Sequence, residues 1–312
     1  FCLSSPTLRP SQALHREGDE QELLSRRLLV AGLLLWLAAP GYCDEAFARF
    51  DLELNRGLVE QNRSLLEAAQ VMEEWASGRL DSQGARRALG QQLEQLKGIR
   101  ARLAGLPANS EQKPLRTAFL DVSSASIELV EAARAFQQGP DPDRKALKSF
   151  ASDHLERSGQ VQARWLTAQE QALGQAMRGA HGQVLSYYVW LGGVLPLRRQ
   201  SLELAQSLQA ALLREDPDLG AIAGQAIRRA IRLSSQVQAS RPAASVQAAH
   251  EALLAEQVAL ARLCEGVALH AQDKSADSAS RVRRYSRQFT RATLEAEERR
   301  LAALEAALRQ KR

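Results

Sequence analysis

The chain has few cysteines and few aromatic residues for its length. Its 312 residues include three cysteines, and Phe, Trp and Tyr together make up 5%. None of the cysteines forms a Cys-x-x-Cys pair, which excludes a zinc ribbon or a thioredoxin-like site, and three cysteines in so long a chain exclude a disulfide scaffold. Sustained alternation of apolar and polar residues is also missing, so we expect no β-sheet. With 45% hydrophobic residues and abundant Ala, Leu, Gln, Arg and Glu, the composition predicts an all-α fold.

The sequence motifs of common catalytic sites are absent. There is no Gly-x-Ser-x-Gly nucleophile elbow, no Gly-x-x-x-x-Gly-Lys phosphate loop and no Gly-x-Gly-x-x-Gly. Metal sites in helical bundles commonly use Glu-x-x-His. Glu is never found three residues before the following histidines: His154, His181, His250 and His270. We therefore interpret the chain as a non-enzyme, with no catalytic residue, no metal site and no bound cofactor.

One apolar run, Leu28–Ala39, is 12 residues long, and two arginines precede it. A transmembrane helix needs roughly 20 apolar residues, whereas the core of an export signal needs roughly 7 to 15. Small residues after the run predict cleavage between Gly41 and Tyr42. A cleaved export signal is therefore the preferred interpretation, and an uncleaved anchor or a core helix are the alternatives.

The residues around this run complete the targeting prediction. We expect residues 25–41 to be the signal and residues 1–24 to be a non-native upstream extension, because they are polar and a signal does not need them. Ser25-Arg26-Arg27 also fits a twin-arginine export motif, although the leucine-rich core favours general secretion. Cys43 is a candidate lipidation site, preceded by a poorly matching Pro-Gly-Tyr. We expect a periplasmic or secreted protein, either free or tethered to a membrane through its N-terminus.

Sequence matches at nearly one offset predict an internal duplication. Residues 106–110 recur 135 positions later, and residues 66–72 recur 136 positions later, mainly in apolar character. Three apolar residues between positions 147 and 166 also match residues 135 positions later. We therefore expect two copies of one unit, a first helical bundle at 44–180 and a second at 181–312.

Each unit contains four segments with apolar residues at helical spacing. In the first unit, a heptad-like seam is formed by Leu89, Leu93, Leu96, Leu103 and Leu106. Candidate helix starts lie at Asp81, Asn109, Asp141 and Asp216. Four helices with short connections predict an up-down bundle. Because no strong helix stop separates the units, we expect two bundles stacked end to end as an elongated rod, and a hinge near 179–196 with the bundles side by side is the alternative.

Some residues with binding chemistry also have a structural interpretation. Tyr187-Tyr188-Val189-Trp190-Leu191 lies at the junction of the units, where we expect it to seal an interface rather than to line an exposed ligand groove. Should a bundle core hold haem or a metal, the candidate ligands are His154, Met72 and Met177. We expect His154 instead to be a partly buried structural residue and Cys264 to be a small core residue.

The net charge of +5 is a small excess of 41 basic over 36 acidic residues. One cluster of arginines is a candidate surface for an anionic partner: Arg281, Arg284, Arg287 and Arg291. Acidic residues one turn later, Glu295, Glu297 and Glu298, make a solvated outer face the competing interpretation. No stacking aromatics remain free beside the cluster, so nucleic acid is not expected as a partner.

Together these patterns predict an exported, non-catalytic helical binding or scaffold protein of the bacterial periplasm or cell surface. The expected partner is another envelope protein or an anionic membrane surface. The alternative is a helical bundle that binds a small ligand or cofactor, haem or a metal, in its core.

Overall fold

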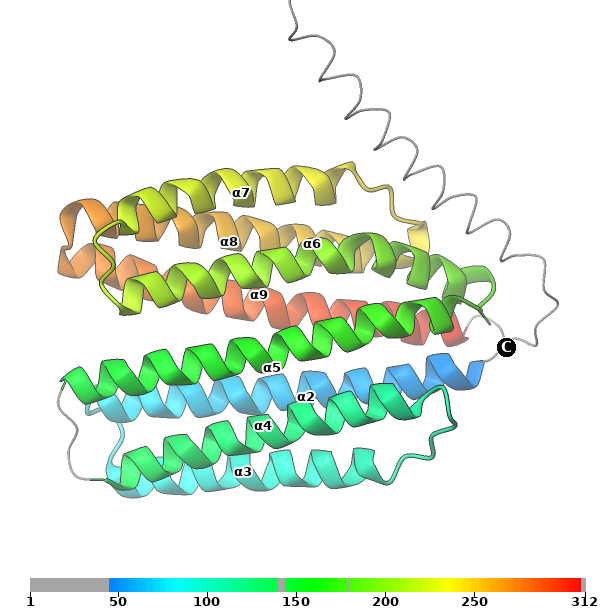
Figure 1. Cartoon of the computed structure of the whole chain (residues 1–312), viewed down its shortest axis with the longest axis horizontal. Helices are drawn as coiled ribbons and strands as arrows, with labels where there is room; N and C mark the ends of the chain where they lie inside the picture. Colours follow the sequence, from blue (N-terminus) through cyan, green and yellow to red (C-terminus); the bar gives the residue numbers. More distant parts are fainter. Residues whose placement is uncertain (1–44, 140–143, 179, 310–312) are drawn as a thin grey trace, which may run out of the picture. The chain divides into compact units, whose positions relative to one another are not determined.

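A computed structural model describes residues 45–139, 144–178 and 180–309, and these residues form α-helices and no strand (Figure 1). The helices are α2 Glu45–Ala76, α3 Ser82–Ala104, α4 Lys113–Gln138, α5 Arg144–Arg178, α6 Gly182–Leu213, α7 Leu219–Ala239, α8 Gln247–Asp273 and α9 Ala276–Arg309, with a short 3-10 helix η2 Ala244–Val246 before α8. The all-α fold is therefore confirmed for the described residues. The expected signal, its cleavage site at Gly41 and Tyr42, and Cys43 lie outside them.

The predicted leucine seam is the core side of α3. Leu89 and Leu96 are fully buried, and Leu93 and Leu103 are nearly so. Full burial of one leucine side chain contributes about 1.5 to 3 kcal/mol, so the seam alone is a substantial part of the packing energy. Leu89, Leu93 and Leu96 pack in a small core cluster, whereas Leu103 belongs to the main core. Leu106, which follows the helix end, is half-buried against the main core.

The predicted helix cap is confirmed for α3, whereas α4 begins later in the chain than predicted. Asp81 caps α3, since its side chain accepts a hydrogen bond from the backbone N–H of Gly84 at 2.6 Å. Asn109 does not cap α4, which begins at Lys113. Its side chain instead accepts from the N–H groups of Glu111 and Gln112, so it stabilises a turn before the helix.

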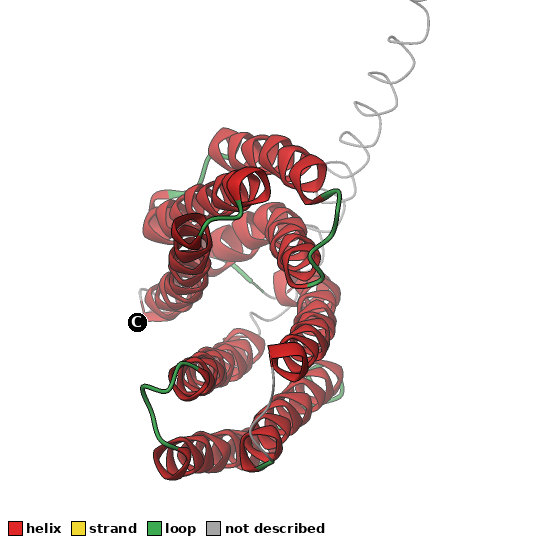
Figure 2. Cartoon of the chain, turned by 90° about the vertical axis from the view of Figure 1, so that its left-hand side faces the viewer, coloured by secondary structure: helices red, strands yellow, loops and turns green. Residues whose placement is uncertain are grey.

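Helices that follow one another along the chain pack against one another. This holds from α2 to α5 and from α6 to α9, and contacts of α5 with α6 and of α2 with α9 join the two groups. Figure 2 looks along the helices and shows only helices and loops among the described residues. The described helices therefore form one compact unit.

The chain reverses direction between α5 and α6. Gly182 begins α6 with φ +56°, in the left-handed region that glycine adopts without steric cost. Across the resulting hairpin, Gln206 donates a hydrogen bond to Gln162 at 3.1 Å, and Arg199 lies 3.4 Å from Glu170. These pairs run antiparallel, so α6 returns alongside α5.

The helices α2 and α9 form a second antiparallel contact. Arg63 pairs with Glu298 at 2.6 Å, and Arg56 pairs with Glu305 at 3.1 Å. Because α5 contacts α6 and α2 contacts α9, the two groups of helices lie side by side. This is the arrangement given as the alternative to the rod. The expected end-to-end rod is not confirmed, because the chain turns back at Gly182 instead of continuing the axis of α5.

Candidate functional site

The predicted anionic-partner residues on α9 are exposed, but two of them are engaged within the protein. Arg287 forms an ion pair with Glu73 of α2. The guanidinium carbon of Arg284 lies 5.2 Å from the ring centroid of Tyr285, a cation–π distance. The other two are Arg281 and Arg291, which the same helix exposes. The cluster therefore combines free arginines with arginines that already have partners.

The candidate cofactor ligands do not meet. His154 and Met177 both lie on α5, 23 residues apart, which is about 35 Å at 1.5 Å per residue. Met72 lies on α2 and packs beside a separate small core cluster. His154 is partly buried, with its ring 5.6 Å from that of Phe150, as expected of a structural histidine. Within the described part of the chain, no group of three or more His, Cys, Asp or Glu could hold a metal ion.

The aromatic segment of α6 is buried. Tyr187 is 0% exposed, Tyr188 1% and Trp190 8%, whereas Val189 is 48% exposed. The Tyr188 hydroxyl donates to the carboxylate of Asp51 on α2 at 3.1 Å. The segment therefore seals the contact between the two helix groups, as expected, and does not form an exposed groove.

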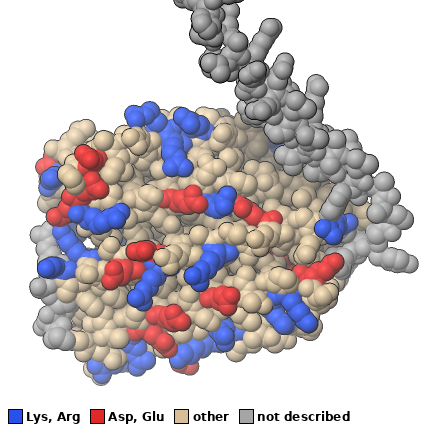
Figure 3. All heavy atoms as spheres, in the orientation of Figure 1, with Lys and Arg blue, Asp and Glu red and all other residues tan. Residues whose placement is uncertain are grey.

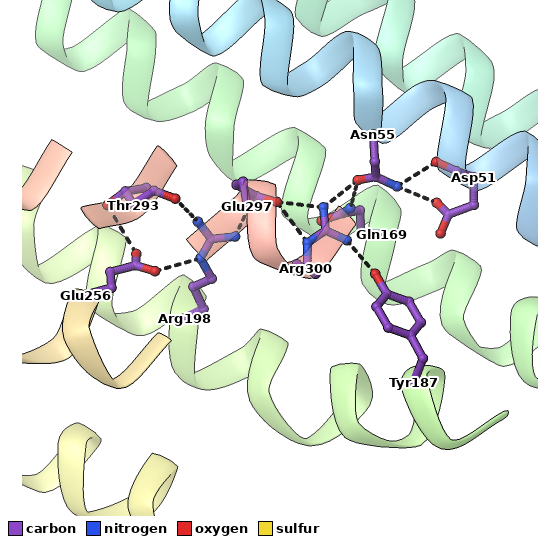
Figure 4. A network of polar contacts seen from close by, with 9 residues as sticks. All are labelled: Asp51, Asn55, Gln169, Tyr187, Arg198, Glu256, Thr293, Glu297 and Arg300. Carbon is purple, nitrogen blue, oxygen red and sulfur yellow. Dashed lines mark hydrogen bonds and ion pairs between the residues drawn. The ribbon is translucent and has the colours of Figure 1, made fainter. Parts of the chain in front are cut away.

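A buried polar network continues from these tyrosines, and its centre is Arg300 of α9 (Figure 4). Arg300 is 4% exposed and donates to the Glu297 carboxylate from Nε at 2.8 Å. It also donates from Nη1 to the Tyr187 hydroxyl at 3.1 Å and from Nη2 to the side-chain oxygen of Asn55 at 2.5 Å. One guanidinium thus links α9 to α6 and to α2.

The α2 side of the network is closed by amides. The Asn55 oxygen accepts a second hydrogen bond from Gln169 of α5 at 2.8 Å. The Asn55 amide nitrogen donates to the Asp51 carboxylate at 2.8 Å and to its backbone oxygen at 2.7 Å. Asn55 is therefore held by neighbours from three helices, with its donor and acceptor groups both engaged.

A second buried arginine extends the network toward α8. Arg198 of α6 donates to Glu297 from Nη1 and to Glu256 of α8 from Nε, the latter at 3.2 Å. Its Nη2 donates to the backbone oxygen of Thr293 at 3.3 Å, and the Thr293 hydroxyl donates to Glu256 at 3.2 Å. Glu297 is thus shared between two guanidinium groups, which is the geometry that best compensates a buried carboxylate.

The three buried carboxyl groups differ in their pKa. For Glu297, burial acts to raise the pKa, but the charges of Arg198 and Arg300 outweigh it and lower the pKa to about 2. Burial raises the pKa of Asp51, although Arg300 opposes the shift. Burial likewise raises the pKa of Glu256 against the attraction of Arg198. Glu297 therefore keeps its charge, while Asp51 and Glu256 are the groups that bind a proton most readily.

Sequence reasoning did not find this network. Arg198 follows the most apolar part of α6. Glu297 was expected on the solvated outer face with Glu295 and Glu298, and this was wrong, because Glu297 is 4% exposed and accepts from Arg198 and Arg300. A signal was present on α9, because Arg300 is four residues after Ala296 and four before Leu304, both of which are buried. A charged residue in register with an apolar stripe indicates a buried ion pair or a ligand.

Two hollows that are open to solvent lie along α9. One is lined by Ala302, Glu305, Ala306 and Arg309, and a second by Arg291, Leu294, Glu295, Glu298, Arg299 and Ala302. No network residue lines either of them. Among the described residues, no helix has an apolar stretch long enough to cross a membrane.

Comparison with known proteins adds no relative from which a role could be transferred. No family model, no curated protein and no solved structure matches the chain.

Proposed function

We propose that this chain is an exported, non-catalytic helical binding or scaffold protein of the bacterial periplasm or cell surface. The observation that carries the proposal is the buried network centred on Arg300. Its ionisable groups hydrogen-bond with one another between α2, α6, α8 and α9, and all of them are buried. Groups arranged in this way hold helices together and have no access to a substrate.

The burial of each charge supports a structural use over catalysis. An acid or base that reacts with a substrate must lie within hydrogen-bond reach of it. Glu256 is 0% exposed and Glu297 4%, and their oxygens are taken up by Arg198, Arg300 and Thr293. Reaching either carboxylate would require the helices to separate.

Element lengths support the further proposal that the helices form two copies of one unit. Going from α2 to α5, the helices have 32, 23, 26 and 35 residues. Going from α6 to α9, they have 32, 21, 27 and 34 residues. The same order of lengths agrees with the offset of about 135 in the sequence, so we propose bundles at 44–180 and 181–312.

Export is tested by expressing the chain in a bacterial host and sequencing the N-terminus of the protein in each cell fraction. We expect a mature protein in the periplasm that begins at Tyr42. A matched variant, Leu33→Arg, places a charge inside the apolar run and should leave the full-length precursor in the cytoplasm. A protein in the envelope fraction that begins upstream of Leu28 would refute the cleaved signal. A lipid-modified N-terminal Cys43 would show that the mature protein is tethered to a membrane and not free.

The scaffold proposal is tested against the alternative of a cofactor-binding core on the purified protein. We expect an absorption spectrum of protein alone and substoichiometric metal content by mass spectrometry. A stoichiometric metal or a haem absorption band would refute the scaffold proposal in favour of a ligand-binding core. Co-purification from the native envelope then identifies the partner.

A further inference from the structure

The helix α7 and the loop after it carry positive charge and no negative charge. Residues 219–250 contain Arg228, Arg229, Arg232 and Arg241, and neither Asp nor Glu occurs among these 32 residues. Acidic and basic residues are almost equal in number over the whole chain, at 36 and 41. The charge on α7 is therefore a local feature and not a reflection of composition.

The arginines of α7 point away from the core. The residues that α7 buries are Leu219, Ala223, Ala226, Ala230, Leu233 and Val237. With 3.6 residues per turn, Arg228 and Arg232 lie on the opposite face, Arg229 at one edge of that face and Ile231 at the other. All four are exposed, and Ile231 is 57% exposed, the highest value among the large hydrophobic residues that the described chain exposes.

No residue of the described ranges forms an ion pair with the arginines of α7. Among the described residues, Arg228, Arg229 and Arg232 make no ion pair and no side-chain hydrogen bond, whereas Arg287 of α9 pairs with Glu73. Figure 3 shows Lys and Arg atoms, without Asp or Glu, along the central part of the upper edge, where α7 runs. The free charges are thus available to an external anion.

We propose that the exposed face of α7 binds the surface of an anionic lipid bilayer. Clustered arginines attract acidic headgroups, and an exposed aliphatic side chain beside them can enter the headgroup boundary, which is the pattern of interfacial helices. The other exposed residues on this face are small or carry amides: Ala221, Gln225, Ser235, Gln236 and Ala239. None is aromatic, so the face offers no stacking platform for nucleic acid bases.

This inference deepens the proposed binding function by naming a membrane partner, but it depends on the charges of α7 and not on export. The two therefore fail separately. A chain that is exported and does not bind vesicles would overturn only the inference. A chain that binds vesicles and stays in the cytoplasm would overturn only the proposed location.

The test is co-sedimentation of the purified full chain with vesicles of phosphatidylcholine alone or with 30% phosphatidylglycerol. We expect binding to the anionic vesicles that weakens as salt rises, because exposed charges are screened. The variant Arg228→Gln/Arg229→Gln/Arg232→Gln should lose affinity on the order of a hundredfold, or about fivefold per arginine. Ile231→Ser should lose a smaller factor of about three to ten.

The matched control removes three exposed arginines at and just before the start of α3: Arg79→Gln/Arg86→Gln/Arg87→Gln. It changes the net charge by the same amount and should retain most of the affinity. All variants keep Leu28–Ala39, so any affinity of that run for lipid cancels in the comparison, and circular dichroism verifies their folding. Equal losses in the two triple variants, equal binding to neutral vesicles, or tighter binding to duplex DNA than to anionic vesicles would overturn the proposal.

Discussion

Replacing Arg300 by methionine tests whether the buried network holds the two helix groups together. The substitution keeps an unbranched side chain of similar reach but removes the charge that Glu297, Asn55 and Tyr187 contact. Among the network residues it leaves Glu297 with Arg198 as its remaining cation, and it removes the positive charge that acts on Asp51. Removing one partner of a buried ion pair costs about 3 to 5 kcal/mol.

The assay is thermal unfolding followed by circular dichroism at 222 nm. For a chain of this size, 1 kcal/mol shifts the melting temperature by roughly 2 to 4 °C, so Arg300→Met should lower it by about 10 °C. The matched control is Arg299→Met on the same helix. The Arg299 side chain is 58% exposed and lies 3.8 Å from Glu295, and an exposed pair of this kind contributes about 0.3 to 0.5 kcal/mol.

The double variant Arg300→Met/Glu297→Leu makes the prediction sharper. It removes the uncompensated carboxylate and leaves Arg198 paired with Glu256, so it should be more stable than the sum of the single variants predicts. If Arg300→Met and Arg299→Met melt within about 2 °C of each other, the network does not stabilise the fold and the reasoning is wrong.

Three further predictions follow from burial and from close approach. Because the pKa of Asp51 is raised in the folded state, the free energy of unfolding should rise as the pH falls from 7 toward the pKa of an unfolded aspartate. Because the pKa of Glu297 is lowered from 4.5 to about 2, the free energy of unfolding should then fall by roughly 3 kcal/mol between pH 4.5 and pH 2. Urea unfolding at a series of pH values measures the rise and the fall. A steady decline of the free energy of unfolding from pH 7 downward would contradict both predictions. Gly57→Ala drives a Cβ into the Leu103 side chain and should lower the free energy of unfolding by about 1 to 3 kcal/mol. Gly90→Ala meets nothing within 4 Å and should raise it by about 0.5 to 1 kcal/mol. Similar shifts of the denaturant midpoint in the two variants would count against the packing of α2. The Cys264 thiol is fully buried, and burial raises its pKa to about 12, so in a chain whose other two cysteines are serine, an aromatic disulfide reagent at pH 8 should react only after unfolding.

The helices were predictable from the sequence because they depend on local spacing. Leu89, Leu93 and Leu96 recur at helical intervals and are buried where that pattern places them. The cap at Asp81 was predictable for the same reason, since a cap involves groups three residues apart. Asn109 was misplaced because its side chain can bond either to a helix start or to a turn, and both use the same short distances.

The arrangement of the helices and the network were not predictable in this way. Arg300 meets Asn55 across 245 positions of sequence, and Arg198 meets Glu297 across 99. Local spacing assigns such residues to solvated faces, because a charge is far more often exposed than buried. Only the packing of α6 and α9 shows which charges are enclosed, and the same packing decides between an end-to-end and a side-by-side arrangement.

The antiparallel contact between α2 and α9 makes the described helices a closed ring, in which each helix packs on the next and the last packs on the first. The start of α2 and the end of α9 lie at the same end of Figure 1, and the Arg56–Glu305 pair joins them. Cutting the chain between α5 and α6 would therefore not separate the halves, because α2 and α9 would still hold them. The first residue of α2 and the last residue of α9 are therefore both at one end of the ring.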